Sequence, residues 1–265
     1  MAIDKLTIVT SKKVDFDKIW HLYFPTSTFK HGFNIRRFKI DDSIHVMIKT
    51  DRDSVSYIET NPNAFGKFIT YLSFLDSIIK GFDVERDHKI CRMDFCADVR
   101  GYPLEYFRAC CSVKNKRHQL FYCSNSKSLV YGKTPQRITI YEKHKLLNNS
   151  GNEIITRVES QCRRDKIPIQ RLCEIEKTRS YNPFEKISFV DVSYDYFEVK
   201  NVREAKNFAY LKNLIELHGI NEARKIVNKD GHFERDFRKF LQPVKKPDLL
   251  AIFQESLDRL LSYIK

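Results

Sequence analysis

Apolar and polar residues alternate over short runs through most of the first 165 residues, which is the pattern of half-buried β-strands. Asp41 and Asp42 separate two of these runs and fit a hairpin turn. A later run at 186–192 has the same character. Together the runs predict strands at 6–10, 33–40, 43–50, 90–99, 119–123, 137–143, 154–163 and 186–192.

Other stretches place apolar residues at helical spacing. Asn61-Pro62-Asn63 reads as a helix start, and the apolar positions that follow continue to Gly81. Shorter helices are predicted at 103–113 and 167–177, and two apolar stripes follow at 208–217 and 249–264. The pattern predicts an α+β protein, with an α+β core at 1–200 and a helical C-terminal region at 201–265. That region could serve packing, dimerisation or DNA binding.

Three of the predicted strands carry charged residues on one face and apolar residues on the other. The apolar faces can pack on helices, so the polar faces would form one charged surface of an antiparallel sheet. An ordinary solvated sheet face alternates in the same way. Here, however, acids and arginines recur at the strand centres, where like charges repel unless a partner is present. The polar positions are Arg92, Asp94 and Asp98; Arg137, Thr139, Tyr141 and Lys143; and Arg157, Glu159, Gln161 and Arg163.

This surface contains the residue types that phosphodiester cleavage needs. Asp94, Asp98 and Glu159 offer the hard oxygen ligands that Mg²⁺ or Mn²⁺ prefers. Tyr141 is a candidate nucleophile whose phenol needs a metal, a cation or a base to ionise at neutral pH. Lys143 and Arg137 share its face. Tyrosine is also an ordinary strand residue, and the chain has 13.

The amino-acid composition narrows the classes of molecule that this protein is expected to bind. Lys and Arg exceed Asp and Glu by 47 to 34, which gives a net charge of +13 and favours a polyanion such as nucleic acid. A lysine-rich proteome would give the same surplus. No apolar run approaches the roughly 20 residues of a membrane span. The odd number of cysteines, 7, makes a poor disulfide framework, so a cytoplasmic location is expected. No GxxxxGK[ST] loop or HxH pair occurs.

The order of these motifs resembles the Rep_trans family of rolling-circle replication initiators, which serve small plasmids and some phages. The matching pieces are an R-x-D-x-x-x-D strand at 92–98, a Tyr/Ser-rich loop at 122–128, I-x-I-Y-x-K ending at Lys143, and R-x-E at 157–159. They fall within 90–165. Each piece alone is weak, whereas the ordered set is more specific.

The resemblance implies a metal-dependent nickase and ligase that attacks one strand at a replication origin, with its nicking or catalytic core at 1–200. Such an enzyme keeps the 5′ phosphate on its tyrosine and leaves a 3′ hydroxyl as a primer. It usually acts as a dimer and recruits a host helicase. By this resemblance Tyr141 becomes the nucleophile, assisted by Lys143, and Asp94 and Glu159 bind Mg²⁺ or Mn²⁺, with Asp98 as a third ligand. The DNA- or phosphate-binding set is Arg92, Arg137, Arg157, Ser124, Ser128 and Lys127.

One departure keeps the nucleophile open. Family members often carry a second tyrosine soon after Y-x-K, where this chain has His144 and Lys145. If that second position is the nucleophile, Tyr122 and Tyr131 are the alternatives to Tyr141. Glu142 falls on the apolar face by alternation, although a bulge would turn it into the site.

Two rival functions use the same surface. A non-catalytic DNA-binding protein would bind with steep salt dependence and would never become attached to DNA. A hydrolytic metal nuclease using Asp94, Glu159 and water would cleave DNA without a covalent adduct.

Overall fold

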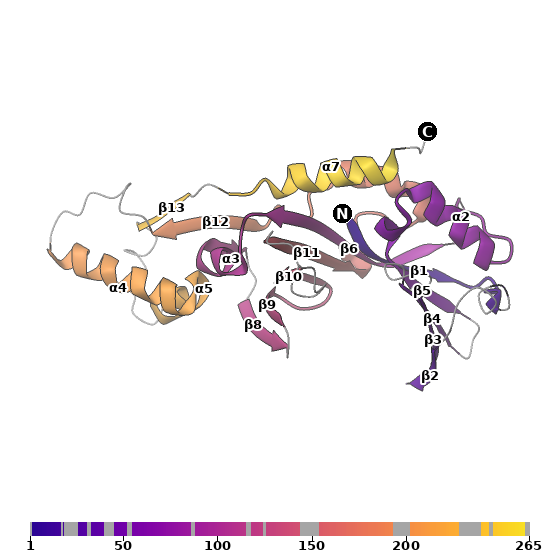
Figure 1. Ribbon diagram of the computed structural model, residues 1–265, viewed down its shortest axis with the longest axis horizontal. Coiled ribbons are helices and arrows are strands. Elements are labelled where there is room, and N and C mark those ends of the chain that lie inside the picture. Colours follow the sequence, from indigo (N-terminus) through magenta and orange to yellow (C-terminus); the bar gives the residue numbers. More distant parts are fainter. Residues whose placement is uncertain are drawn as a thin grey trace.

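The computed structural model describes residues 2–16, 18, 26–30, 33–39, 45–51, 55–85, 88–114, 118–123, 126–143, 154–192, 202–227, 240–243 and 246–262. Within these residues an antiparallel ten-stranded sheet runs in the order β2-β3-β4-β5-β1-β6-β11-β10-β9-β8 (Figure 1). Its strands are β1 (Ile3–Thr10), β2 (Thr26–Lys30), β3 (Phe33–Lys39), β4 (His45–Thr50), β5 (Ser56–Thr60), β6 (Lys89–Arg100), β8 (His118–Cys123), β9 (Ser126–Tyr131), β10 (Gln136–Glu142) and β11 (Ile155–Arg163).

The predicted α+β class is confirmed, and each predicted strand is present with small shifts of its ends. Three strands of the sheet, β2, β5 and β9, were not predicted, because their sequences are short and mostly polar. The prediction of a loop at 122–128 is wrong: β8 extends to Cys123, and β9 begins at Ser126. The turn at Asp41-Asp42 lies outside the described residues.

Two short helix predictions need correction. The helix expected at 103–113 ends early, as α3 (Leu104–Cys110), and the chain continues as β7 (Cys111–Val113). The stretch expected as a helix at 167–177 starts extended and becomes the 3-10 helix η3 (Leu172–Ser180). Polar and charged residues fill most of η3, so few apolar contacts are available to extend it as a regular α-helix.

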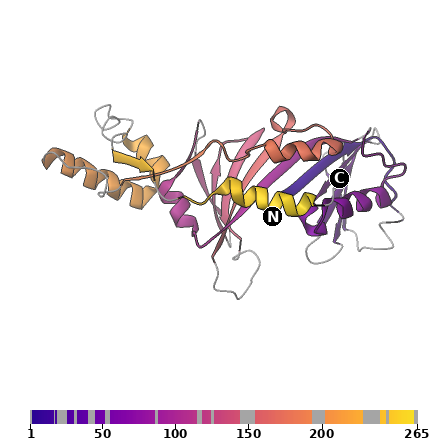
Figure 2. The same ribbon diagram turned by 90° about the horizontal axis from the view of Figure 1, so that it is seen from above.

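One face of the sheet is apolar and covered by helices. α2 (Phe68–Ile78), η3 and α7 (Leu249–Leu261) lie over it, and α7 crosses the strands at its centre (Figure 2). The ring of Phe95 on β6 lies 5.2 Å from that of Tyr181 and 5.6 Å from that of Phe253 on α7. Along β6 the core residues Met93, Phe95 and Ala97 alternate with polar residues such as Arg92, Asp94 and Asp98, as strand geometry requires.

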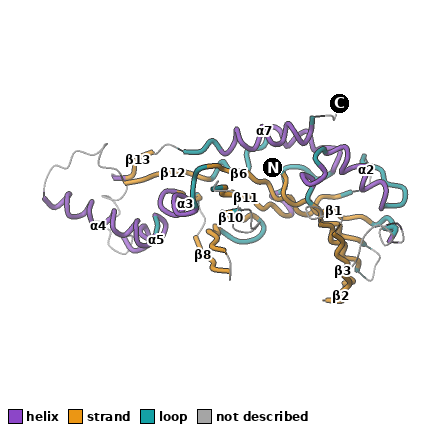
Figure 3. The backbone as a smooth tube through the Cα atoms, in the orientation of Figure 1, coloured by secondary structure: helices purple, strands orange, loops and turns teal. Residues whose placement is uncertain are grey.

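The opposite face is polar and lies on the inside of a bend. β2–β4 descend at one end of the sheet and β8 and β9 at the other, both on the side away from α7 (Figure 1). Helices gather over the apolar face and at the ends of the sheet, whereas strands make up most of the concave side (Figure 3). Because the bend brings neighbouring side chains together, Asp94, Arg157 and Gln161 are buried although they lie on the polar face.

The helical C-terminal region contains two separate packing units. α4 (Val202–His218) and α5 (Ile220–Val227) form a second cluster with Phe240, and Val190 packs against it. Val190 belongs to β12 (Ile187–Val192), which joins β7 and β13 (Leu241–Pro243) in a small sheet. α7, in contrast, belongs to the main core. The boundary at residue 200 stays a prediction.

Gly219 shows why the first C-terminal stripe ends where it does. It lies between α4 and α5 with φ +78°, and a Cβ there would come within 2.7 Å of the carbonyl oxygen of Arg108 on α3. Only glycine combines that backbone conformation with so close an approach.

Packing of α7 predicts a large cost for losing its central ring. Phe253→Ala removes a fully buried ring from the main core and should lower the free energy of unfolding by about 3–5 kcal/mol in urea titrations. The control is Gln254→Ala, an exposed neighbour on the same helix, which should change stability by less than about 0.5 kcal/mol. Equal effects of the two substitutions would contradict the assignment of α7 to the core.

Candidate active site

The polar faces predicted from the sequence do lie side by side. Asp98 on β6 is opposite Arg157 on β11, and Arg157 is opposite Tyr141 on β10. Tyr141 is in turn opposite Ser128 on β9. Directly opposite residues of antiparallel strands have Cβ atoms about 5 Å apart, so this row forms a continuous strip of interacting side chains.

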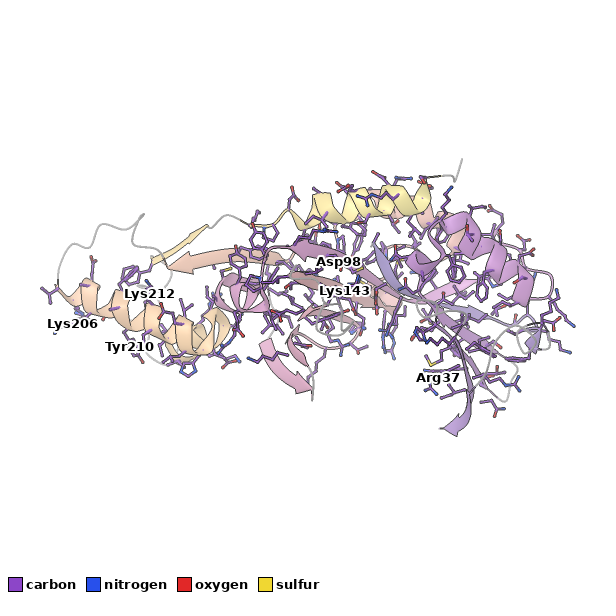
Figure 4. All side chains as sticks on the ribbon, in the orientation of Figure 1. Arg37, Asp98, Lys143, Lys206, Tyr210 and Lys212 are labelled. Atoms are coloured by element: carbon purple, nitrogen blue, oxygen red, sulfur yellow. The ribbon has the colours of Figure 1, made fainter. Side chains whose placement is uncertain are left out.

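Arg157 is the centre of that strip. Its Nε and Nη2 donate to the two carboxylate oxygens of Asp98 at 2.7 and 3.0 Å, and its Nη1 donates to Asp4 on β1. The Nζ of Lys143 donates to Asp98 at 3.1 Å, and Figure 4 shows these two side chains close together beneath β6. Arg157 therefore ties β11 to β6 and β1 through charge-assisted hydrogen bonds.

These cations hold Asp98 in its ionised form. Burial raises the pKa of its carboxyl, but the hydrogen bonds and charge of Arg157, together with Lys143, outweigh burial and lower that pKa to about 2. Asp98 is thus fully neutralised by two cations. The structure does not bring it to the other two acids as a third metal ligand.

A second arginine, Arg92 on β6, is bonded to two acids in the same way as Arg157. The Nε of Arg92 donates to both oxygens of Asp94 at 3.0 and 3.1 Å, and its Nη1 donates to Glu59 on β5 at 3.1 Å. The amide nitrogen of Gln161 adds a bond to Asp94 at 3.2 Å. Asp94 has no exposed surface, so these partners satisfy a fully buried carboxylate.

Glu159 differs from the other acids because no described cation forms a hydrogen bond or ion pair with it. The hydroxyl of Tyr141 donates to its Oε2 at 3.4 Å. Burial, followed by the nearby carboxylates of Asp94 and Asp4, raises the pKa of Glu159 to about 7. Burial also raises the pKa of Tyr141 far above its ordinary value, although Arg157 opposes this shift. The pair is therefore a neutral phenol beside a proton-accepting carboxylate.

Two acids of this site, Asp4 and Glu59, were missed by sequence reasoning. Asp4 precedes the predicted start of its strand, and the register of β1 against β6 shifts there: Ile3 is opposite Phe95, whereas Lys5 is opposite Asp94. Such a bulge is invisible to simple alternation. Glu59 belongs to the unpredicted β5, where buried Ser56, Ile58 and Thr60 alternate with polar neighbours and gave a weak signal.

The acids of this site could bind a metal ion only together with ligands from the substrate and water. No group of three or more Asp, Glu, His or Cys residues that could hold a metal occurs in the described part of the chain. Mg²⁺, however, is often bound by one or two carboxylates together with substrate phosphates and water. Glu159 fits that arrangement, because no described cation pairs with its carboxylate, whereas the neighbouring Asp94 could join it only by exchanging its bonds to Arg92 for the ion.

The predicted DNA-binding residues are divided between the two faces. Arg92, Arg137, Arg157 and Ser128 lie on the polar face by strand register. Lys127 lies on the other face of β9, where its Nζ is 3.7 Å from Glu105 of α3. Ser124 lies outside the described residues.

Of the two alternative nucleophiles, the structure excludes Tyr131 and does not describe the side chain of Tyr122. Tyr131 is fully buried on the apolar side, and its hydroxyl donates to the carbonyl oxygen of Cys111 at 3.0 Å, so it cannot reach a phosphate. His144 and Lys145, and the side chain of Tyr122, lie outside what the structure describes. Glu142 accepts a hydrogen bond from the Leu104 amide at 3.1 Å and thus caps α3 instead of entering the site.

Comparison with known proteins gives a similarity in structure but none in sequence. No protein-family model matches the chain, and no curated protein matches it. The structure is similar to that of the rolling circle replication initiator protein from Geobacillus stearothermophilus, with 16% identity and a TM-score of 0.42, covering 75% of this chain and 88% of that chain. A similarity at that level does not establish the family. In the described residues no helix is long and apolar enough to cross a bilayer.

The Arg157 cluster predicts a pH-dependent contribution to stability. Because the folded pKa of Asp98 lies below its ordinary value, its stabilisation is present above about pH 4 and is lost as pH falls towards 2. Asp98→Asn should lower the free energy of unfolding at pH 7 by roughly 2–4 kcal/mol, since buried Arg157 loses its carboxylate. The difference from wild type should shrink as the pH falls from 4 to 2.

Asp76→Asn is the matched control, because Asp76 is exposed on α2. Chemical denaturation across this pH range should leave its curve parallel to wild type. A constant deficit for Asp98→Asn at every pH would show that its ion pairs are not the source of the effect.

Proposed function

We propose that this protein is a DNA strand-nicking enzyme in which Tyr141 attacks a phosphodiester and becomes covalently linked to the 5′ phosphate. One observation carries the proposal: the Tyr141 hydroxyl donates to the Glu159 carboxylate at 3.4 Å, on a concave face that also holds Arg137, Arg157 and Lys143. The ordered sequence motifs that resemble Rep_trans initiators support the same role.

The chemistry follows from the paired groups. As the phenolic oxygen of Tyr141 forms its bond to phosphorus, its proton passes to Oε2 of Glu159. The bond from phosphorus to the 3′ oxygen breaks, and that oxygen leaves as a 3′ hydroxyl after taking a proton from water. Attack by a 3′ hydroxyl on the phosphotyrosine reverses these steps and rejoins the strand.

The cations around Tyr141 would stabilise the negative charge of the phosphate during the reaction. Lys143 directly follows β10, and its Nζ lies on the polar face, where it donates to Asp98; Arg157 lies opposite Tyr141 on the next strand. Positive charge near a phosphoryl group stabilises the negative charge that develops as the bonds exchange. Arg157 contributes mainly as a fixed positive charge near the phosphate, because its guanidinium is already bonded to Asp98 and Asp4.

A divalent ion is part of the proposal. Glu159 and Asp94 would hold Mg²⁺ or Mn²⁺, and the ion would polarise the phosphate. The proposed substrate is a single-stranded or supercoiled replication origin, and the product is a primer for rolling-circle replication. A host helicase and a second copy of the chain are the proposed partners.

Loss of the nucleophile tests the proposal directly. Tyr141→Phe should abolish the covalent protein–DNA complex, read as a labelled strand retained on denatured protein, because no oxygen remains to attack phosphorus. DNA affinity should stay within about twofold of wild type, since the ring and its surroundings persist. Tyr210→Phe, an exposed position on α4 far from the site (Figure 4), is the control and should form the complex normally.

The two rival functions give different results in the same assay. A non-catalytic DNA-binding protein would form no covalent complex even as wild type. A hydrolytic nuclease would cut DNA without attachment, and Tyr141→Phe would leave its cleavage rate unchanged.

Removal of the proton acceptor should slow the reaction without abolishing binding. Glu159→Gln keeps a hydrogen-bond acceptor for the Tyr141 hydroxyl but cannot take its proton, so adduct formation should fall by roughly 10²–10⁴-fold. Glu255→Gln, an exposed acid on α7, is the control. Single-turnover rates should separate the two, and an unchanged rate in Glu159→Gln would exclude Glu159 from the reaction.

A further inference from the structure

A pocket of about 190 Å³ lies on the polar face beyond Arg92, towards the descending strands. Residues of five adjacent strands, from β4 to β11, form it, and the acids of the Tyr141 site do not line it apart from Glu59. Its lining consists of Thr7, Met47, Lys49, Tyr57, Glu59, Cys91, Arg92 and Arg163.

The pocket has an excess of positive charge. Arg163 lies directly opposite Arg92, and like charges in that position repel. Arg92 is neutralised by Asp94 and Glu59. Arg163, in contrast, has no carboxylate partner among the described residues, and its buried Nε has no hydrogen-bond partner. Lys49 on the other side of the pocket likewise forms no ion pair in the described part, so an anion is favoured here.

The wall that carries Lys49 can also contact a flat apolar group, because Lys49 lies directly opposite Tyr57 on the neighbouring strand. The ring of Tyr57 and the thioether of Met47 are half-buried on neighbouring strands and line the same pocket as the two cations. An aromatic ring beside cations is the usual combination in proteins that bind single-stranded nucleic acid, where the ring stacks on a base and the cations hold the backbone.

Unpartnered polar atoms connect this pocket to the Tyr141 site. Arg137 on β10 is diagonal to Arg163 on β11, and Thr139 and Tyr141 follow Arg137 on the same face. Like Arg163, Arg137 has a buried Nε without a hydrogen-bond partner. The buried hydroxyl of Thr139 also has no hydrogen-bond partner. Buried donors without partners are uncommon in proteins, and an absent ligand is one explanation of them.

We propose that this pocket holds one nucleotide of the single strand on one side of the cleavage site, with its base on Tyr57 and its phosphate on Arg163 and Lys49. The strand then crosses the polar face past Arg137 and Thr139 to Tyr141. The inference rests on the proposed function for the position of the cleaved phosphate, but it concerns binding and adds a specific subsite to it.

Fluorescence anisotropy with labelled oligothymidylate tests the subsite in the full-length Tyr141→Phe protein, in which cleavage does not interfere. Tyr57→Leu should weaken binding about 5- to 100-fold with an unchanged salt slope, because stacking is lost and charge is kept. Arg163→Gln and Lys49→Gln should each reduce the slope of log K against log salt by about 0.7, the value for one phosphate contact on a single strand.

Three controls accompany these variants. Tyr57→Phe keeps the ring and should bind like the parent, which separates stacking from a folding defect. Arg259→Gln removes an exposed charge on α7, over the other face of the sheet, and should leave the slope unchanged. An abasic strand of the same length should bind the Tyr57→Leu protein and its parent equally, since it has no base to stack.

Unchanged affinity in Tyr57→Leu and Arg163→Gln would overturn the subsite. An equal loss with duplex DNA would also overturn it, because paired bases cannot enter the pocket. The result is independent of nicking: an enzyme that forms adducts but shows no effect of these variants retains the proposed function and lacks the subsite. A protein that forms no adducts but loses single-strand affinity in them retains the subsite and lacks the function.

Discussion

The shared ion pairs of Arg157 and Arg92 are the interaction on which the polar face depends. Each guanidinium lies between two carboxylates. Arg157 on β11 pairs with Asp98 on β6 and Asp4 on β1, and Arg92 on β6 pairs with Asp94 of its own strand and with Glu59 on β5. Charges buried on a sheet face are costly unless they are paired with good geometry, and these planar donors supply it. They fix four acids on β1, β5 and β6 and join the strands on which the rest of the site is built.

The same pairing explains why Glu159 is available for chemistry. The two arginines neutralise the other buried acids around it, and Glu159 is left with the hydroxyl of Tyr141 and with repulsion from Asp94 and Asp4. A carboxylate in that position favours a proton or a cation. Structural stability and reactivity are therefore divided within one cluster: the paired acids hold the face together, and the unpaired one is ready to accept a proton.

Alternation along the strands was enough to predict which residues share the face. It brought Asp94, Arg157, Glu159 and Tyr141 together correctly, because side-chain direction in a strand is set by the backbone. It could not predict partners. The pairing of Asp98 with Arg157 depends on strand order and register, Asp4 enters through a bulge, and Glu59 comes from a strand too short to be recognised. Lys127 fell on the wrong face because β9 was taken for a loop.

The central claim is that the Tyr141 oxygen forms the bond to DNA, and peptide mapping tests it most directly. Trypsin cleavage after Arg137 and Lys143 yields the peptide 138–143, in which Tyr141 is the only tyrosine. After reaction with origin DNA, nuclease trimming and digestion, mass spectrometry should find this peptide heavier by the remaining nucleotide, with the added mass on Tyr141. The same mass on a peptide containing Tyr122, or on no peptide while DNA is cut, would contradict the account.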